Sequence, residues 1–198
     1  MNHPLHCRCG TLRGYISHPR KANRAVCYCK DCQAYAHVLG RSGDVLDEMG
    51  GTDVIATLAK YVAFTQGIEA LACLSLSPNG LLRWYANCCD TPVGNTPRNA
   101  KVSYVGLVHS CLEDPSTTLE SSFGPVRMRV NTQSARGKPN STPIRTAACV
   151  VRLATSLLRA RLDGGYKATP FFLPERGTPV APPRVLTADE RARVMNAL

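Results

Sequence analysis

Residues 26–33 read VCYCKDCQ and place three thiols within six positions. A buried cysteine packs as a small apolar residue, so packing alone gives no reason for two further thiols beside it. The side chains of Cys27 and Cys29 point to the same side of an extended segment, and a turn can bring Cys32 back towards them. Three converging sulfurs are typical of a zinc site, and three protein ligands leave the fourth tetrahedral position open.

Four other thiols occur in two close pairs, Cys7 with Cys9 and Cys88 with Cys89. Four thiolates complete a closed, structural zinc site, whereas a catalytic site keeps one position for water or substrate. The sequence therefore predicts a closed site made by these four cysteines and an open site made by the three in residues 26–33. The remaining cysteines stand alone in apolar segments and are expected in the core: Cys73, Cys111 and Cys149.

Length and composition favour one soluble, cytoplasmic domain. The chain has 198 residues, 44% of them apolar, which is enough to form a core. No apolar run is long enough to span a bilayer, and the first six residues lack the apolar segment of a signal peptide, so we expect no membrane partner. Ten cysteines would suggest disulfides in a secreted chain, but a reducing compartment and the tight spacings at residues 7–9 and 27–32 favour metal thiolates.

The net charge of +10 is concentrated in the C-terminal part of the chain. Eleven basic and 9 acidic residues precede Glu120, whereas 13 basic and 5 acidic residues lie from Glu120 onward. This excess allows a nucleic acid or another acidic partner, but no nucleic-acid-binding motif accompanies it. Scattered solvent-exposed arginines are therefore the favoured explanation of the charge, and an acidic partner is the alternative.

Turn residues and alternation predict β-structure in the first 130 residues. Gly10 permits the positive φ of a tight turn between two short strands, and Asn79-Gly80 is the clearest hairpin signal. Residues 90–92 are expected to form a turn. Strands are expected within residues 5–16, 52–65, 71–77, 81–86, 102–108 and 126–130.

Helices are expected at residues 31–36, directly after the three-thiol stretch, and at residues 146–162. Thr187 and Glu190 predict a capping box for a last short helix. We expect a β-domain over residues 1–137 and an extension over residues 138–198 that packs on it. The long helix should face the sheet with Ala147, Val150, Val151, Ala154, Leu157, Leu158 and Leu162.

Three motifs together resemble the glutathione-dependent formaldehyde-activating enzyme family, which includes centromere protein V. They are CRCG at residues 7–10, CYCKDCQ at 27–33, and RWY at 83–85 followed by CDTP at 89–92. Their order and spacing agree with the family over about the first hundred residues. The C-terminal extension resembles that of an uncharacterised bacterial branch.

This resemblance implies a mainly β, α+β fold of the β-tent type, stapled by zinc. It further implies a structural zinc on the first and last motifs and a second zinc on the middle one. The implied activity is that of a carbon–sulfur lyase, which joins formaldehyde reversibly to the thiol of glutathione. One motif departs from the family. The family has Cys-x-x-Cys-Gly, and the matching positions here are Ala86, Cys89 and Asp90, so the first cysteine is missing. Cys88 is the candidate to supply that sulfur.

Three functions follow as alternatives. In the first, Cys27, Cys29 and Cys32 hold an open zinc that accepts a small-molecule thiol such as glutathione. In the second, all zinc is structural and the chain is a binding module for an acidic partner. In the third, the clustered thiols form a redox or metal sensor. His37 is a possible fourth ligand, and basic residues near the motif are candidates to meet the carboxylates of glutathione: Arg24, Lys30 and Arg41.

Overall fold

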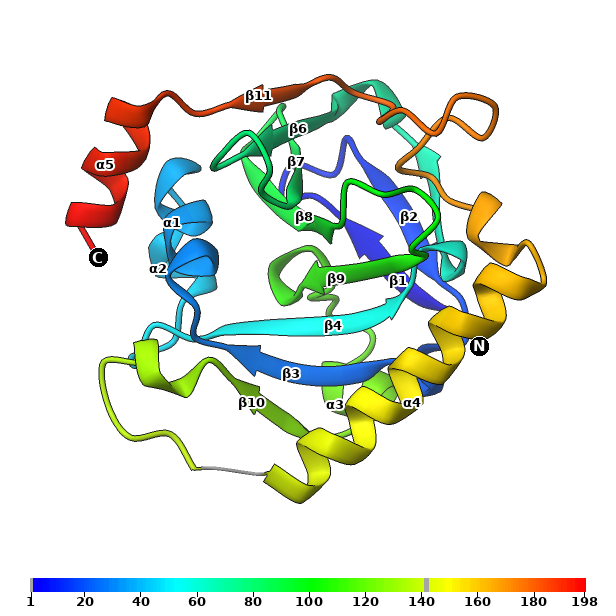
Figure 1. Ribbon diagram of the computed structural model, residues 1–198, viewed down its shortest axis with the longest axis horizontal. Helices are drawn as coiled ribbons and strands as arrows, with labels where there is room; N and C mark the ends of the chain where they lie inside the picture. The colour runs from blue at the N-terminus through cyan, green and yellow to red at the C-terminus, as the bar shows by residue number, and fades with distance from the viewer. Residues whose placement is uncertain (1, 141–142) are drawn as a thin grey trace.

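The computed structural model describes residues 2–140 and 143–198 and shows the expected α+β fold (Figure 1). Within these residues the strands form two sheets. The smaller sheet has the order β1 (His3–His6), β2 (Arg13–Ile16) and β5 (Val62–Gln66). The larger sheet has the order β10 (Met128–Val130), β3 (Asn23–Cys27), β4 (Thr52–Leu58), β9 (Tyr104–Val108), β8 (Thr91–Thr96), β7 (Leu82–Ala86), β6 (Leu71–Ser75) and β11 (Pro183–Val185).

Helices cover the ends and the outer edge of the larger sheet (Figure 1). The α-helices are α1 (Lys30–Val38), α2 (Ser42–Val45), α3 (Leu119–Phe123), α4 (Pro143–Leu162) and α5 (Ala188–Asn196). Short 3-10 helices are η1 (Pro19–Lys21), η2 (Ala59–Tyr61), η3 (Ile68–Ala70), η4 (His109–Cys111), η5 (Thr132–Ser134) and η6 (Gly165–Lys167). None of the described helices is both long and apolar enough to cross a membrane.

The two predicted hairpins are confirmed. Strands β1 and β2 pair antiparallel around a turn in which Gly10 has φ 77°, and β6 pairs antiparallel with β7. The helix expected at residues 31–36 lies within α1, and the capping box at Thr187 and Glu190 begins α5. These features were predictable because the turn and capping residues act within a few positions of one another.

Strand β8 is a correction, because residues 90–92 were expected to form a turn alone and the strand begins at Thr91. Proline donates no hydrogen bond to a β-ladder and is usually a sign against a central strand. Here Pro92 lies opposite Tyr85, at an irregularity in the β7–β8 register between Trp84 and Tyr85. The shifted register accommodates the proline within the larger sheet.

The core centres on Trp84, which is fully buried on β7. Its Nε1 donates a hydrogen bond to Thr96 Oγ1 at 2.9 Å, which satisfies the buried indole. Phe171 and Phe172 pack against this indole from the C-terminal segment, with ring centroids 5.2 and 6.3 Å away. Residues beyond 138 therefore contribute to the same core, while the proposed division into residues 1–137 and 138–198 stays a prediction.

The orientation of α4 is a second correction. Residues that were expected to face the sheet are largely exposed, including Val151 (63%), Leu158 (57%) and Leu162 (78%). The buried positions are instead Cys149 and Ala160. A polar contact explains this orientation: Arg152 Nη2 donates a 2.9 Å hydrogen bond to the Ala22 carbonyl and also binds the buried Asn23 side chain.

The segment after α1, residues 44–51, is only partly exposed. The short helix α2 includes Asp44, and Val45 is buried. Gly51 is buried as well, at a place where a β-carbon would lie 2.5 Å from Val26 Cγ1 and 2.6 Å from Tyr28 Cε1. The lack of a side chain at Gly51 therefore lets this loop close over the three-thiol stretch.

Candidate functional site

The structure brings together four cysteines from two chain turns that are about eighty residues apart in the sequence. Cys7 and Cys9 lie in the turn between β1 and β2, and Cys88 and Cys89 lie in the turn between β7 and β8. The Sγ–Sγ distances are 3.5 Å for Cys7–Cys9, 3.3 Å for Cys9–Cys88 and 3.8 Å for Cys88–Cys89. Four thiolates around zinc are about 3.8 Å apart, so this group fits a tetrahedral zinc ion.

Local backbone conformation places these sulfurs. The Leu12 amide donates to Cys7 Sγ at 3.3 Å, which closes the first turn around the sulfur. After Cys89, Asp90 takes a left-handed conformation with φ 53°, one that glycine adopts most readily and that aspartate tolerates better than most residues. Asp90 therefore takes the position of the glycine in the Cys-x-x-Cys-Gly motif that the sequence resembles. The turn brings the adjacent thiols of Cys88 and Cys89 into one group.

The second group consists of Cys27, Cys29 and Cys32. Cys27 ends β3, Cys29 is the N-cap of α1, and Cys32 lies in the first turn of that helix. The Cys32 amide donates to Cys29 Sγ at 3.3 Å, and the Sγ atoms of Cys27 and Cys32 are 3.8 Å apart. The positive end of the helix dipole stabilises thiolates at this position. In residues 2–140 and 143–198 no fourth histidine, cysteine or carboxylate joins the group.

Asn131 also contacts this group, and sequence reasoning missed it. Strand β10 runs parallel to β3 with Val130 opposite Cys27, so the residue after Val130 lies beside the thiols. Asn131 has φ 55°, and its Nδ2 donates to Cys27 Sγ at 3.4 Å. A parallel pairing between strands about a hundred residues apart leaves no local signal in the sequence.

Arg83 is a buried cation beside the same thiols, with only 2% of its surface exposed. Its Nη1 donates to Asn95 Oδ1 at 2.9 Å and lies 4.0 Å from Cys32 Sγ. Its Nη2 is 3.6 Å from Asp31 Oδ2. A buried charge is costly unless it is paired, and Arg83 is paired with the carboxylate while it faces the sulfur. The sequence singled out Arg83 only as part of the RWY motif of the family that it resembles, and it predicted no role for the side chain.

Hydrogen bonds among the three thiols give them unequal pKa values. Bonds from Cys29 and Cys32 lower the pKa of Cys27, while the same bonds raise the pKa of the two donors. Burial raises the pKa of Tyr104, and the nearby thiols raise it further. The group thus favours one thiolate at Cys27 beside a phenol that keeps its proton.

His37 and two of the three expected basic residues make contacts elsewhere, whereas Lys30 is the first residue of α1, directly after Cys29. Arg24 pairs with Asp53 at 2.7 Å, and Arg41 Nη2 donates to the Cys89 carbonyl at 2.6 Å, beside the four-cysteine group rather than the three-cysteine group. His37 belongs to neither cysteine group. The three isolated cysteines are buried, as expected: Cys73, Cys111 and Cys149.

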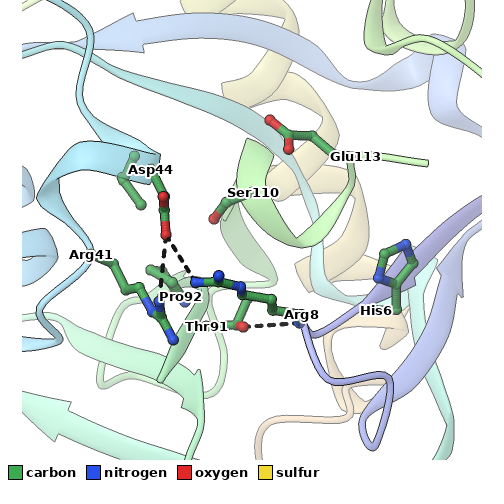
Figure 2. A pocket seen from close by; sticks show the side chains of 9 residues that line it. His6, Arg8, Arg41, Asp44, Thr91, Pro92, Ser110 and Glu113 are labelled. Carbon is green, nitrogen blue, oxygen red and sulfur yellow. Dashed lines mark hydrogen bonds and ion pairs between the residues drawn. The ribbon is translucent and has the colours of Figure 1, made fainter. Parts of the chain in front are cut away.

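A cleft of about 480 Å³ is lined by residues that neighbour the four-cysteine group in the sequence, including Arg8 and Thr91. Figure 2 shows the side chains that line it. Arg8, which lies between Cys7 and Cys9, forms one wall together with Thr91, whose Oγ1 is 3.0 Å from Cys89 Sγ. The complete lining is His6, Arg8, Arg41, Asp44, Val45, Thr91, Pro92, Ser110 and Glu113.

A protein-family model described as "Family of unknown function (DUF6151)" matches residues 1–181. The chain belongs to this family. The matched region includes both cysteine groups and the cleft, and it ends before β11 and α5. No curated protein matches the chain. Membership in the DUF6151 family therefore covers the candidate sites without assigning them a reaction.

Proposed function

We propose that this member of the DUF6151 family is a zinc-binding protein that joins a small-molecule thiol to formaldehyde at the three-cysteine group. The observation that carries the proposal is the convergence of Cys27, Cys29 and Cys32 without a fourth ligand among the described residues. The motif resemblance to glutathione-dependent formaldehyde-activating enzymes supports the choice of glutathione as the thiol.

The residues of the chain would divide the work as follows. Cys27, Cys29 and Cys32 would hold the zinc, and the four-cysteine group would hold a second, structural zinc. Bound zinc supplies Lewis acidity and lowers the pKa of a thiol that reaches it. Arg83, fixed by Asn95 at 2.9 Å, would offset part of the negative charge of the three thiolates that hold the zinc.

The proposed reaction balances without a redox partner. The thiol sulfur forms a bond to the aldehyde carbon, the carbonyl π bond breaks, and the thiol proton ends on the former carbonyl oxygen. The product is an S-hydroxymethyl thiol, and the reverse reaction releases both reactants. No other co-reactant is needed.

Metal analysis and calorimetric titration with glutathione test this proposal. Wild-type protein is expected to carry about two zinc ions and to bind glutathione, with added formaldehyde converted to the S-hydroxymethyl adduct in NMR spectra. Cys29→Ser should lose one zinc and glutathione binding, while Cys149→Ser, a cysteine outside both groups, should retain both. Wild-type protein that holds both zinc ions and fails to bind glutathione would refute the lyase function.

The four-cysteine group supports a redox sensor as a second candidate function. Cys9 and Cys88 are exposed with Sγ atoms 3.3 Å apart, and hydrogen bonding by Thr11 lowers the pKa of Cys9 to about 6. Accessible thiolates are readily oxidised. Peroxide should then oxidise Cys9 and Cys88 to a disulfide while it is itself reduced to water, and one zinc should be released. Dithiothreitol should reduce the disulfide, and added zinc should then bind again. Retention of both zinc ions under peroxide would exclude this function.

A further inference from the structure

Two arginines from separate parts of the chain converge on one carboxylate in the cleft beside the four-cysteine group. Arg8 Nη1 and Arg41 Nη1 each lie 3.5 Å from the same oxygen, Asp44 Oδ2. Figure 2 shows them reaching Asp44 from two sides. Direct charge-assisted hydrogen bonds between arginine and carboxylate are about 2.7–2.9 Å long. Asp44 therefore holds both guanidinium groups loosely, and 57% of its side chain is exposed.

The two arginines are held in place by the chain that carries the cysteines. Arg41 Nη2 donates a 2.6 Å hydrogen bond to the Cys89 carbonyl, and only 23% of its side chain is exposed. The Arg8 amide donates to Thr91 Oγ1 at 3.0 Å. The first contact fixes the guanidinium of Arg41, and the second fixes the backbone from which the Arg8 side chain enters the cleft. A preorganised cation such as Arg41 loses less entropy when it binds an anion.

The rest of the cleft sets the kind of anion that fits. Its volume of about 480 Å³ lies within the usual range for small-molecule sites. Asp44 and Glu113 would repel a doubly charged phosphate, whereas Val45 and Pro92 offer apolar surface. Ser110 Oγ is buried and has no hydrogen-bond partner in the part of the chain that the structure describes. It lines the same cleft and can turn to bind a polar ligand atom.

We infer that this cleft binds the carboxylate of a small amino-acid or peptide ligand, which replaces Asp44 between Arg8 and Arg41. The side chain of Asp44 occupies the position of the ligand carboxylate in the ligand-free state. The cleft is independent of the three-cysteine group and of the proposed lyase reaction, because its residues contact the four-cysteine group instead.

Titrations of the zinc-loaded protein with defined small molecules test this inference. Glycine represents a free amino acid, N-acetylglycylglycine represents a peptide C-terminus, and N-acetylglycylglycinamide is the same peptide with a neutral amide in place of the carboxylate. Affinity is measured from amide NMR shifts of Arg8, Thr91 and Ser110. At least one carboxylate is expected to bind and to shift these amides, while the neutral amide is not. The tighter of the two identifies the source of the carboxylate.

Three variants make the test specific. Arg8→Ala should weaken binding by about tenfold or more, because one of the two charge-assisted contacts is lost. Asp44→Asn should tighten binding by about three- to tenfold, because the internal competitor loses its charge. Arg145→Ala, which removes a positive charge from α4 outside the cleft, should leave the affinity unchanged.

Several results would overturn the inference. Equal binding of N-acetylglycylglycinamide and N-acetylglycylglycine would show that the carboxylate is not recognised, and tighter binding of inorganic phosphate would show that the cleft selects another class of anion. An affinity that is unchanged or weaker in Asp44→Asn would show that Asp44 does not compete with the ligand. Thermal unfolding of each variant confirms that a lost affinity reflects the cleft and not a lost fold, and Arg8 suits this purpose because 66% of its side chain is exposed.

Discussion

Asp90 shows how a single backbone angle assembles the four-cysteine group. The residue has φ 53° directly after Cys89, in a conformation that costs most side chains about 1–2 kcal/mol. Aspartate tolerates this region better than β-branched residues do. The turn therefore keeps its geometry although the glycine of the resembling motif is missing.

Substitution of Asp90 tests this explanation. Asp90→Gly should leave thermal stability and zinc content close to those of the wild type, because glycine adopts the same angle freely. Asp90→Val should lower the free energy of unfolding by about 1–3 kcal/mol and weaken zinc retention by the four-cysteine group. Equal stability of the two variants in urea denaturation would argue against a requirement for positive φ.

His3 gives the fold a defined response to acid. The ring is fully buried, with Nε2 2.8 Å from the Leu112 carbonyl and Nδ1 2.8 Å from Ser122 Oγ. Burial lowers the pKa of His3 below its usual 6.5, so the unfolded chain binds this proton more readily than the folded chain. The stability contributed by neutral His3 is present above pH 6.5 and is lost as the pH falls through the lowered pKa.

Urea denaturation between pH 7.5 and pH 5 measures this effect. Wild-type protein should lose stability over this interval more steeply than His3→Gln, which cannot take up the proton but can still donate to the Leu112 carbonyl. The difference between the two slopes isolates His3 from the protonation of the cysteine groups, which both proteins share. Parallel slopes would mean that His3 does not contribute.

Periodicity predicted the presence of helix α4 but not the face that it buries. The spacing of apolar residues predicted a helix, and the structure confirms one over Pro143–Leu162. Periodicity fixes the relative positions of residues around a helix, whereas the face that meets the sheet depends on the partner surface. Here Arg152 binds the Ala22 carbonyl and the Asn23 side chain, more than a hundred residues away, and turns the apolar stripe outward.

Two substitutions in α4 separate the buried face from the exposed one. Ala160→Leu should destabilise the protein by about 1–3 kcal/mol, because Ala160 is only 1% exposed and has no room for added atoms. Leu158→Gln should change the free energy of unfolding by no more than about 0.5 kcal/mol, because Leu158 is 57% exposed. Reversed effects in chemical denaturation would place the packed face on the side that periodicity suggested.

In the candidate sites, the clustered cysteines were predictable from the sequence, but the residues that contact them were not. All seven clustered cysteines were recognisable from spacing, because zinc chemistry needs several sulfurs and short spacings bring them together. Arg83, Asn95 and Asn131 were not assigned to the three-cysteine group, since the sheet brings them there from distant segments. Long-range pairing, and not local chemistry, supplies the surroundings of the thiols.

For the whole molecule, the four-cysteine group connects the two sheets. Cys7 and Cys9 belong to the smaller sheet's hairpin, and Cys88 and Cys89 belong to the β7–β8 turn of the larger sheet. Metal binding at such a group adds directly to folding free energy. The three-cysteine group instead joins β3 to the start of α1, within a short stretch of chain.

The two groups should therefore respond differently to the loss of one ligand. Cys9→Ser is expected to lower the melting temperature and the soluble yield strongly, whereas Cys29→Ser is expected to lose one zinc with a smaller change in melting temperature. Calorimetry together with metal analysis of both variants checks this contrast. Equal unfolding by the two substitutions would contradict a structural role restricted to the four-cysteine group.

The connection between the sheets also predicts how amide protons exchange with solvent. With zinc bound, amides of β1, β2 and β5 should exchange only when the entire molecule opens. After chelation these three strands should become a separate opening unit that exchanges earlier than β4, β7 and β9. Hydrogen–deuterium exchange would then show two cooperative opening units in place of one, with the boundary between them at the turns that carry the cysteines.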